Sequence, residues 1–321
     1  MARYLITGIA GFIGSTLAHT LVARGDEVRG IDNLSTGNLD NLADIRERID
    51  FQQMDLQDAA GMKSACQGVE FILHQAALAS VPRSVKDPLT SHESNINGTL
   101  NLLLAARDAK VRRIVYAASS SAYGDQPTQP KQEEMLPLPL SPYAVQKLAC
   151  EYYIQAFFRT YGLEGICLRY FNIFGPRQAA DSPYSGVIAK FTTTMMEGQT
   201  PTIFGDGLTS RDFTFIDNAV SANLLACQAP SAVATGRVFN IGTGKSHTLN
   251  QVYAAIAGQL GFSGKPLYGP PRAGDVRHSL ADIHRAAGEL GYQPKARFQE
   301  GLRKTVAWYL AEKEKRAAAA L

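Results

Sequence analysis

Short apolar runs alternate with longer segments of helical spacing through the first half of the chain. The apolar runs predict strands at Arg3–Thr7, Glu27–Ile31, Ile49–Met54, Val69–His74, Arg113–Ala118 and Gly165–Arg169. The intervening segments predict helices at Phe12–Arg24, Met62–Cys66, Ser94–Ala109 and Tyr143–Tyr161. Regular alternation of this kind predicts an α/β fold, with a doubly wound parallel sheet covered by helices on both faces.

The pattern becomes less regular after Tyr170. Pro and Gly become frequent, and two further stretches of helical spacing follow at Val187–Glu197 and Leu249–Leu260. We therefore expect a first domain over residues 1–170 and, over residues 171–312, mainly a smaller α/β lobe. Segments within about 210–245 are expected to cross back to the first domain, and residues 313–321 to form a tail outside the fold.

Composition narrows the function classes. The chain is 45% hydrophobic and 19% charged, as in ordinary globular proteins, and its net charge of +3 gives no reason to expect nucleic acid or a membrane surface as partner. We expect neither a membrane span nor a signal peptide, because no apolar run is long enough and the N-terminus enters a strand pattern at once. Four scattered cysteines without a CxxC pair indicate free thiols in the cytoplasm, and the histidines lack metal-ligand spacing, so no metal is expected.

Three glycines mark a candidate dinucleotide site. Gly8, Gly11 and Gly14 lie between the first strand and the first helix, where residues without Cβ let the backbone approach a pyrophosphate at a helix N-terminus. The GxxGxxG spacing differs from the common GxGxxG and is weak by itself. Asp32 strengthens it, because a carboxylate at the end of the second strand binds a ribose 2′-hydroxyl and repels a 2′-phosphate. The cofactor expected is therefore NAD.

A second group of polar residues points to acid–base chemistry. Tyr143 and Lys147 are four residues apart on a predicted helix and so share one face. A nearby ammonium, together with a positively charged nicotinamide, lowers the pKa of a phenol and makes it a usable base. Ser119 follows a predicted strand, at the edge of the sheet where ligands bind, together with Ser120 and Ser121.

These motifs together resemble the nucleotide-sugar branch of the extended short-chain dehydrogenases. The matching segments are Thr7–Gly14, Asp32–Gly37, Ser119–Gly124, Tyr143–Lys147 and Arg169–Asn172, and the likeness extends from Arg3 to about Leu310. Gln75–Ser84 and Thr209–Phe213 are most similar to bacterial UDP-N-acetylglucosamine 4-epimerases. The resemblance implies a Rossmann-type NAD-binding domain, a smaller α/β substrate-binding lobe and inversion at C4 of a UDP-sugar through a 4-keto intermediate.

The resemblance also implies roles for individual residues. Tyr143, Lys147 and Ser119 would be catalytic, assisted by Ser120 and Ser121. The NAD contacts would be Gly8, Gly11, Phe12, Ile13, Gly14, Asp32, Asn33, Ser35, Thr36, Gly37, Asp55, Leu56, Gln75, Ala76, Ala77, Ala79, Ser94, Ser119, Tyr143, Lys147 and Phe171. The UDP-sugar contacts would be Ser80, Val81, Arg83, Ser121, Tyr143, Asn172, Val187, Phe204, Arg211, Arg272, Asp275 and Ser279. For Asp55, a helix N-cap is an alternative reading.

Two positions discriminate between reactions of this branch. Related 4,6-dehydratases carry an Asp–Glu pair where this chain has Ser120 and Ser121, so dehydration is rejected. Ser279 aligns with a pocket residue that is tyrosine in epimerases restricted to glucose and galactose, so the serine leaves room for an N-acetyl group. UDP-galactose and UDP-glucuronate stay open as substrates. A cofactor-sensing regulator on this fold typically lacks the catalytic Tyr and Lys, whereas this chain has Tyr143 and Lys147.

The resemblance further implies a homodimer formed by the helices Ser94–Ala109 and Tyr143–Tyr161.

Overall fold

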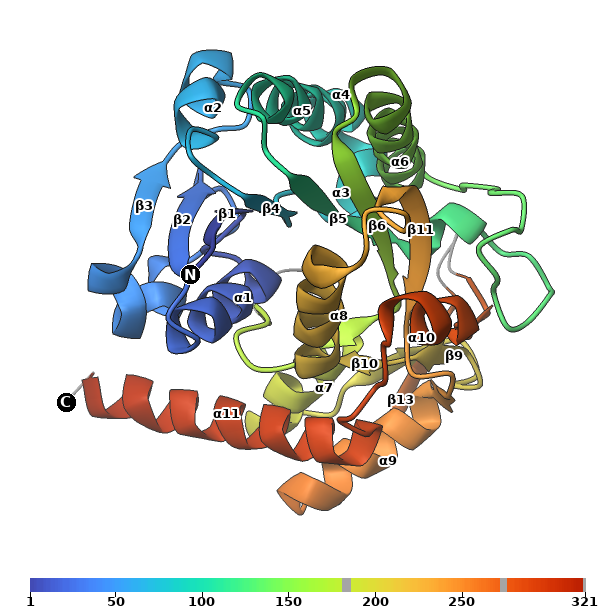
Figure 1. The fold of residues 1–321 in the computed structure, drawn as a ribbon. Coiled ribbons are helices and arrows are strands. Elements are labelled where there is room, and N and C mark those ends of the chain that lie inside the picture. The colour runs from blue at the N-terminus through green and yellow to red at the C-terminus, as the bar shows by residue number, and fades with distance from the viewer. Residues whose placement is uncertain (181–185, 272–275, 320–321) are drawn as a thin grey trace.

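A parallel sheet forms the centre of the computed structural model, which describes residues 1–180, 186–271 and 276–319 (Figure 1). Seven strands of the described chain follow the order β11-β6-β5-β4-β1-β2-β3. They are β1 (Arg3–Thr7), β2 (Glu27–Asp32), β3 (Asp50–Gln53), β4 (Phe71–His74), β5 (Arg113–Ser119), β6 (Glu164–Tyr170) and β11 (Thr235–Ile241). The strand order reverses between β1 and β4. In open α/β sheets, the carboxyl ends of the strands at such a reversal form the ligand crevice.

Helices cover both faces of the sheet because side chains along each buried strand alternate between the faces. Tyr4 and Ile6 of β1 pack with helices α1 (Phe12–Ala23) and α8 (Ile216–Gln228). Leu5 packs on the opposite face with α2 (Ala59–Ala65), α5 (Gly98–Asp108) and α6 (Pro142–Tyr161). Figure 1 shows these two layers on either side of the sheet. The expected doubly wound α/β fold is confirmed.

Shorter elements connect the strands to this helical shell. They are the 3₁₀ segments η1 (Leu39–Arg48) and η3 (Ser120–Tyr123), the π-helical turn η2 (Glu93–Asn97), and helices α3 (Val81–Lys86) and α4 (Pro88–His92). The helix expected at Ser94–Ala109 therefore begins as a π-helical turn and continues as α5. A π-helical turn widens a helix locally and is often found near functional sites.

The smaller lobe consists of short strands and helices beyond β6. Its strands are β7 (Ile173–Phe174), β8 (Thr202–Phe204), β9 (Ser210–Asp212), β10 (Thr214–Phe215), β12 (Ser246–Thr248), β13 (Leu267–Gly269) and β14 (His278–Ser279). They pair as β12-β9-β14, β13-β8 and β10-β7. Its helices are α7 (Val187–Met196), α9 (Leu249–Leu260) and α10 (His284–Leu290). Helix α8 and strand β11 lie between these pieces in sequence but belong to the central sheet and its cover.

The C-terminal helix α11 (Phe298–Ala319) differs from the sequence-based expectation of a tail from residue 313. It lies along the lower side of the molecule beside α7 and α9 (Figure 1). The ammonium of Lys313 donates to the carbonyl of Met196 at the end of α7, 2.7 Å away. This contact holds the distal turns of α11 to the smaller lobe. None of the described helices is long and apolar enough to cross a membrane.

Candidate active site

A cavity of about 1020 Å³ opens at the carboxyl ends of β1, β2 and β4. Most of the residues expected to contact NAD line it, and Ser80 and Arg83 of the expected substrate set do so as well. The lining residues of the NAD set are Gly8, Gly11, Phe12, Ile13, Gly14, Asp32, Asn33, Ser35, Thr36, Gly37, Asp55, Leu56, Gln75, Ala76, Ala77, Ala79 and Ser94. The glycine turn and the end of β2 therefore meet at one site, where the sheet topology places a ligand.

The glycine turn is shaped by two close backbone approaches. Gly8 has φ of +69°, and a Cβ there would lie 2.9 Å from the backbone nitrogen of Ala76. A Cβ on Gly14 would lie only 2.1 Å from the carbonyl oxygen of Gly8. Backbone conformation and space both demand glycine here. The N-terminus of α1 at Phe12 thereby faces the cavity with free N–H groups suited to a pyrophosphate.

Asp32, at the end of β2, lines the cavity with its carboxylate held by two backbone groups. One carboxylate oxygen accepts from the backbone N–H of Ala10 at 2.9 Å, and the other accepts from Leu34 at 2.8 Å. Burial raises the pKa of Asp32, and these two hydrogen bonds oppose that shift. Each oxygen keeps a second lone pair for a ribose hydroxyl. Asp55 also lines the cavity and accepts from Asn33, whereas the N-cap of α2 is Asp58, so the N-cap alternative for Asp55 is wrong.

A buried histidine fixes the loop that follows β4. Thr99 donates to the carbonyl of Asn95, so its hydroxyl accepts from Nε2 of His74, 2.9 Å away. On the other side of the ring, the hydroxyl of Thr7 accepts from the N–H of Ala76 and therefore donates to Nδ1 of His74 at 2.7 Å. His74 is thus held neutral. The chain of bonds ends at Ala76, which lines the cavity.

The neutral state of His74 predicts that the free energy of unfolding falls in acid. Burial, with a smaller effect of Lys147, lowers the pKa of His74 to about 3. Between pH 6.5 and 3 the unfolded chain binds the extra proton and the folded chain does not, so stability falls as the pH falls. We expect a loss of about 2 kcal/mol in the free energy of unfolding at pH 5. Urea titrations at pH 7.5 and pH 5 measure it, and His74→Gln should remove this part of the loss; an equal loss in that variant would contradict the assignment.

The expected catalytic residues converge at the end of β5 and the start of α6. The N-cap Ser141 and Pro142 begin this helix, and the backbone N–H of Tyr143 donates to Oγ of Ser84 at 3.0 Å. The hydroxyl of Ser121 donates to Oγ of Ser119 at 2.8 Å. The hydroxyl of Ser119 in turn lowers the pKa of the Tyr143 phenol. Ser119 therefore lies between Ser121 and Tyr143 in this group, and Ser120 is half-buried.

The charges around Tyr143 differ in detail from the sequence-based picture. Burial raises the pKa of Tyr143, and the hydrogen bond from Ser119 opposes this. The ammonium of Lys147 donates to the carbonyl of Ala117, 2.7 Å away, and burial lowers its pKa to about 8. Lys147 is therefore directed at the β5 backbone. The hydrogen bond of Ser119 and the positive charge of an oxidised nicotinamide are left to favour the phenolate.

Several residues expected to hold the sugar nucleotide lie together in the smaller lobe. Arg211 on β9 pairs in register with Ser279 on β14, and its guanidinium donates to the carbonyls of Ser210 and Arg277. Asn172 donates to the carbonyl of Asp212, 3.1 Å away. Val81 is the first residue of α3, Val187 is the first residue of α7, and Phe204 is the last residue of β8. Arg272 and Asp275 lie outside the described residues.

Comparison with known proteins decides the family. The model of the NAD dependent epimerase/dehydratase family matches residues 4–242. The chain belongs to this family. NAD is therefore the cofactor of this epimerase/dehydratase family member, and the glycine turn with Asp32 fits it.

The family member is similar over nearly its whole length to proteins named as UDP-sugar 4-epimerases. UDP-glucose 4-epimerase of Mycolicibacterium smegmatis is 40% identical over 312 residues, covering 96% of this chain and 98% of that protein. UDP-glucuronate 4-epimerase of Thermodesulfobacterium geofontis is 33% identical, covering 96% of each chain. The structure of UDP-N-acetylglucosamine 4-epimerase from Methanobrevibacter ruminantium, in complex with UDP-N-acetylmuramic acid, has a TM-score of 0.92 at 38% identity and covers 97% of this chain and 99% of that one.

Some cavity residues had no counterpart in the sequence analysis. Arg177 and Gln178 after β7, Lys190 on α7, and the α11 residues Trp308 and Arg316 also line the cavity. Trp308 and Arg316 lie on α11, where no helix is predicted from the sequence, and no motif in the sequence marks Arg177, Gln178 or Lys190. Phe171, expected to contact NAD, is instead fully buried against Tyr123, so its side chain packs in the core. Among the described residues no group of three or more His, Cys, Asp or Glu could hold a metal ion.

Proposed function

We propose that this chain is a UDP-sugar 4-epimerase that interconverts UDP-N-acetylglucosamine and UDP-N-acetylgalactosamine. The similarity to three kinds of UDP-sugar 4-epimerase supports inversion at C4. The N-acetyl sugar is supported by the resemblance to these epimerases, which aligns Ser279 with a tyrosine of the enzymes restricted to glucose and galactose; Ser279 lies on β14 beside Arg211. A serine there leaves space for an N-acetyl group.

The reaction follows from the residues at the end of β5. The phenolate of Tyr143 takes the proton of the sugar 4-hydroxyl, while Ser119 donates a hydrogen bond to the same oxygen. A bound NAD would supply the acceptor, and later the donor, of the C4 hydride. Rotation of the 4-keto sugar presents its other face, and Tyr143 then gives the proton back to the oxygen. Proton and hydride are both restored, so the reaction has no net redox change.

The serine turn bears on the type of reaction, and charge and size bear on the choice of sugar. Ser120 and Ser121 carry no carboxylate, so the acid–base pair that elimination of water requires is missing at this turn. A serine at position 279 would not exclude UDP-glucose or UDP-galactose, which are smaller, and UDP-glucuronate would need a partner for its carboxylate. We therefore keep UDP-glucose and UDP-glucuronate as second candidates for the same catalytic residues.

The first test is to incubate the protein separately with UDP-N-acetylglucosamine, UDP-glucose and UDP-glucuronate. We expect the C4 epimer of the N-acetyl sugar to appear fastest in proton NMR spectra, because Ser279 leaves the N-acetyl group unobstructed. Conversion of only UDP-glucose or UDP-glucuronate would contradict the N-acetyl assignment. Conversion of none of them with NAD present would contradict the 4-epimerase assignment itself. Ser279→Tyr should lower the turnover of the N-acetyl sugar and spare that of UDP-glucose.

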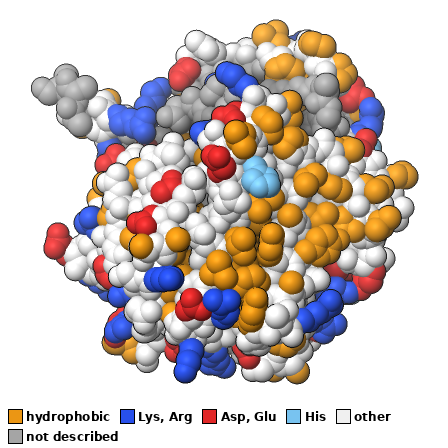
Figure 2. Space-filling view, turned by 90° about the horizontal axis from the view of Figure 1, so that it is seen from above, with side chains coloured by type: hydrophobic (Ala, Val, Ile, Leu, Met, Phe, Trp, Pro, Cys, Tyr) orange, Lys and Arg blue, Asp and Glu red, His pale blue; other side chains and the backbone are white. Residues whose placement is uncertain are grey.

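We also propose a homodimer in which α6 and its neighbours face a second copy. Large apolar side chains are exposed on this face (Figure 2), among them Val85 at 63%, Leu89 at 68%, Val145 at 50% and Tyr152 at 54%. These residues lie on α3, α4 and α6, which pack against one another. Exposed apolar surface of this kind marks interaction sites on proteins. Light scattering, which gives the mass of the particle in solution, tests the proposed homodimer.

We further propose a cytoplasmic location, which fits the buried free thiols of the four cysteines.

A further inference from the structure

The loop that follows the catalytic serines runs beside the segment that carries Ser279. In this loop Gln129 uses both ends of its carboxamide. Its Nε2 donates to the carbonyl of His278 at 2.8 Å, and its Oε1 accepts from the backbone N–H of Leu280 at 3.1 Å. The two peptide groups bound in this way are those on either side of Ser279. A single side chain thus takes the place of a neighbouring strand at this position.

Other bonds hold the same segment at its two ends. The backbone N–H of Arg277 donates to Asp125 at 3.1 Å. Beyond Leu280, Lys131 donates its N–H to the carbonyl of Leu280 at 2.7 Å and accepts from the N–H of Asp282 at 2.9 Å. On the opposite side β14 pairs with β9, which places Ser279 beside Arg211. Between Asp125 and Lys131, Gln129 is the side chain that binds the peptide groups flanking Ser279.

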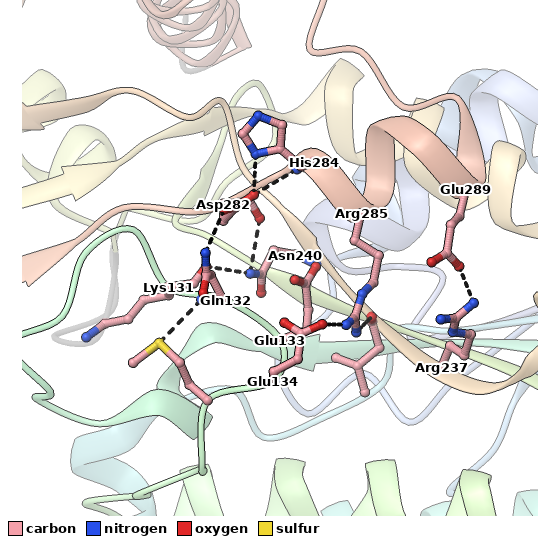
Figure 3. Close-up of polar contacts among 12 residues, drawn as sticks. Lys131, Gln132, Glu133, Glu134, Arg237, Asn240, Asp282, His284, Arg285 and Glu289 are labelled. Atoms are coloured by element: carbon pink, nitrogen blue, oxygen red, sulfur yellow. Dashed lines mark hydrogen bonds and ion pairs between the residues drawn. The ribbon is translucent and has the colours of Figure 1, made fainter.

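The loop itself is anchored to the catalytic domain. The side chain of Asn240 on β11 donates to the carbonyl of Lys131 at 2.8 Å, and Figure 3 shows these residues meeting Asp282. The hydroxyl of Tyr123, at the end of the serine turn η3, donates to Asn240 at 2.6 Å. A continuous set of hydrogen bonds therefore connects the serine turn, the loop and the backbone around Ser279. Such networks carry positional constraints between elements that are far apart in sequence.

We propose that Gln129 is a specificity-determining positioning residue, which fixes the position of the backbone around Ser279 relative to the reacting sugar. It touches neither substrate nor cofactor and acts through the backbone on either side of Ser279. This proposal rests on the proposed role of Ser279 in the sugar pocket. Without the carboxamide, the backbone around Ser279 loses its outer pair of bonds and can move toward the sugar. The N-acetyl group, which needs the most room, would be affected most.

The test compares Gln129→Ala and Gln129→Glu with the matched control Gln132→Ala. Gln132 lies in the same loop but donates to the carboxylate of Asp282, away from the peptides of Ser279. Glu at position 129 keeps an acceptor for Leu280 but cannot donate to His278. Both Gln129 variants should lower kcat/KM for UDP-N-acetylglucosamine relative to UDP-glucose by about tenfold, mainly through KM. Gln132→Ala should leave this ratio unchanged.

Hydrogen exchange of the backbone amides around Leu280 reports whether this segment is held in place, independently of enzyme activity. Gln129→Ala should increase exchange there, and Gln132→Ala should not. Faster exchange with an unchanged substrate ratio would overturn the proposal, as would an equal change of the ratio in all three variants. If the wild type instead prefers another UDP-sugar, the N-acetyl assignment fails separately. The role of Gln129 is then judged on the KM of that sugar, which Gln129→Ala should raise about tenfold and Gln132→Ala should leave unchanged.

Discussion

Tyr143→Phe is expected to lower kcat by a factor of about 10²–10⁴, the usual effect of losing general acid–base catalysis. The substitution removes the hydroxyl whose pKa Ser119 lowers and keeps the ring in its half-buried position. The helix start should stay intact, because the bond from Tyr143 to Ser84 comes from the backbone N–H. Steady-state turnover of the preferred UDP-sugar measures the effect, and binding of NAD should be little changed.

A control for this variant is Tyr161→Phe, at the far end of the same helix. Tyr161 is half exposed and packs its ring against Phe157 and Arg107, contacts that a phenylalanine retains. Its turnover should equal that of the wild type. Near wild-type turnover in Tyr143→Phe would remove the phenol from the mechanism and leave Lys147, buried and bonded to Ala117, as the remaining candidate for proton transfer.

Features with a local cause could be predicted from the sequence. The predicted strands and helices between Arg3 and Tyr170 follow from apolar runs and helical spacing, and the structure changes their ends by only a few residues. The short helices η1, α3 and α4 of the same range have no such pattern and could not be predicted. The turn at Gly8–Gly14 and the carboxylate of Asp32 follow from spacing after strands, and they line one cavity as expected. Tyr143 and Lys147 share a helix face for the same local reason.

Features that depend on distant contacts could not be predicted in this way. Helix α11 packs against the smaller lobe through Lys313 and the end of α7, and nothing near Lys313 in sequence announces that contact. The carboxylate of Asp212 accepts from Thr243, Gly244 and Ala281, which joins three separate segments of the smaller lobe. The contacts of Gln129 could not be predicted for the same reason, because its partners His278 and Leu280 lie about 150 residues away in the sequence. Periodicity carries no information on such pairs.

The glycine turn yields the second large expected effect. Gly14→Ala should raise the Kd for NAD by at least about tenfold and lower the free energy of unfolding by about 1–3 kcal/mol. The added Cβ would lie 2.1 Å from the carbonyl oxygen and 2.8 Å from the carbonyl carbon of Gly8, and both atoms belong to the backbone. They cannot rotate away. Relief requires the whole turn to move, although Gly8 is fixed by its N–H bond to Ile31.

Equilibrium dialysis of NAD against the cofactor-free protein, with urea unfolding alongside, measures both effects. Gly288→Ala in α10 is the matched control, because its Cβ would meet no atom within 4 Å and its backbone is helical. That variant should bind NAD as the wild type does and gain about 0.4–1 kcal/mol, since alanine restricts the unfolded chain. If Gly14→Ala bound NAD with wild-type affinity, the turn would have to yield without cost. The pyrophosphate would then not depend on the close approach of α1 to Gly8, and the cavity rather than the turn would determine how the cofactor is held.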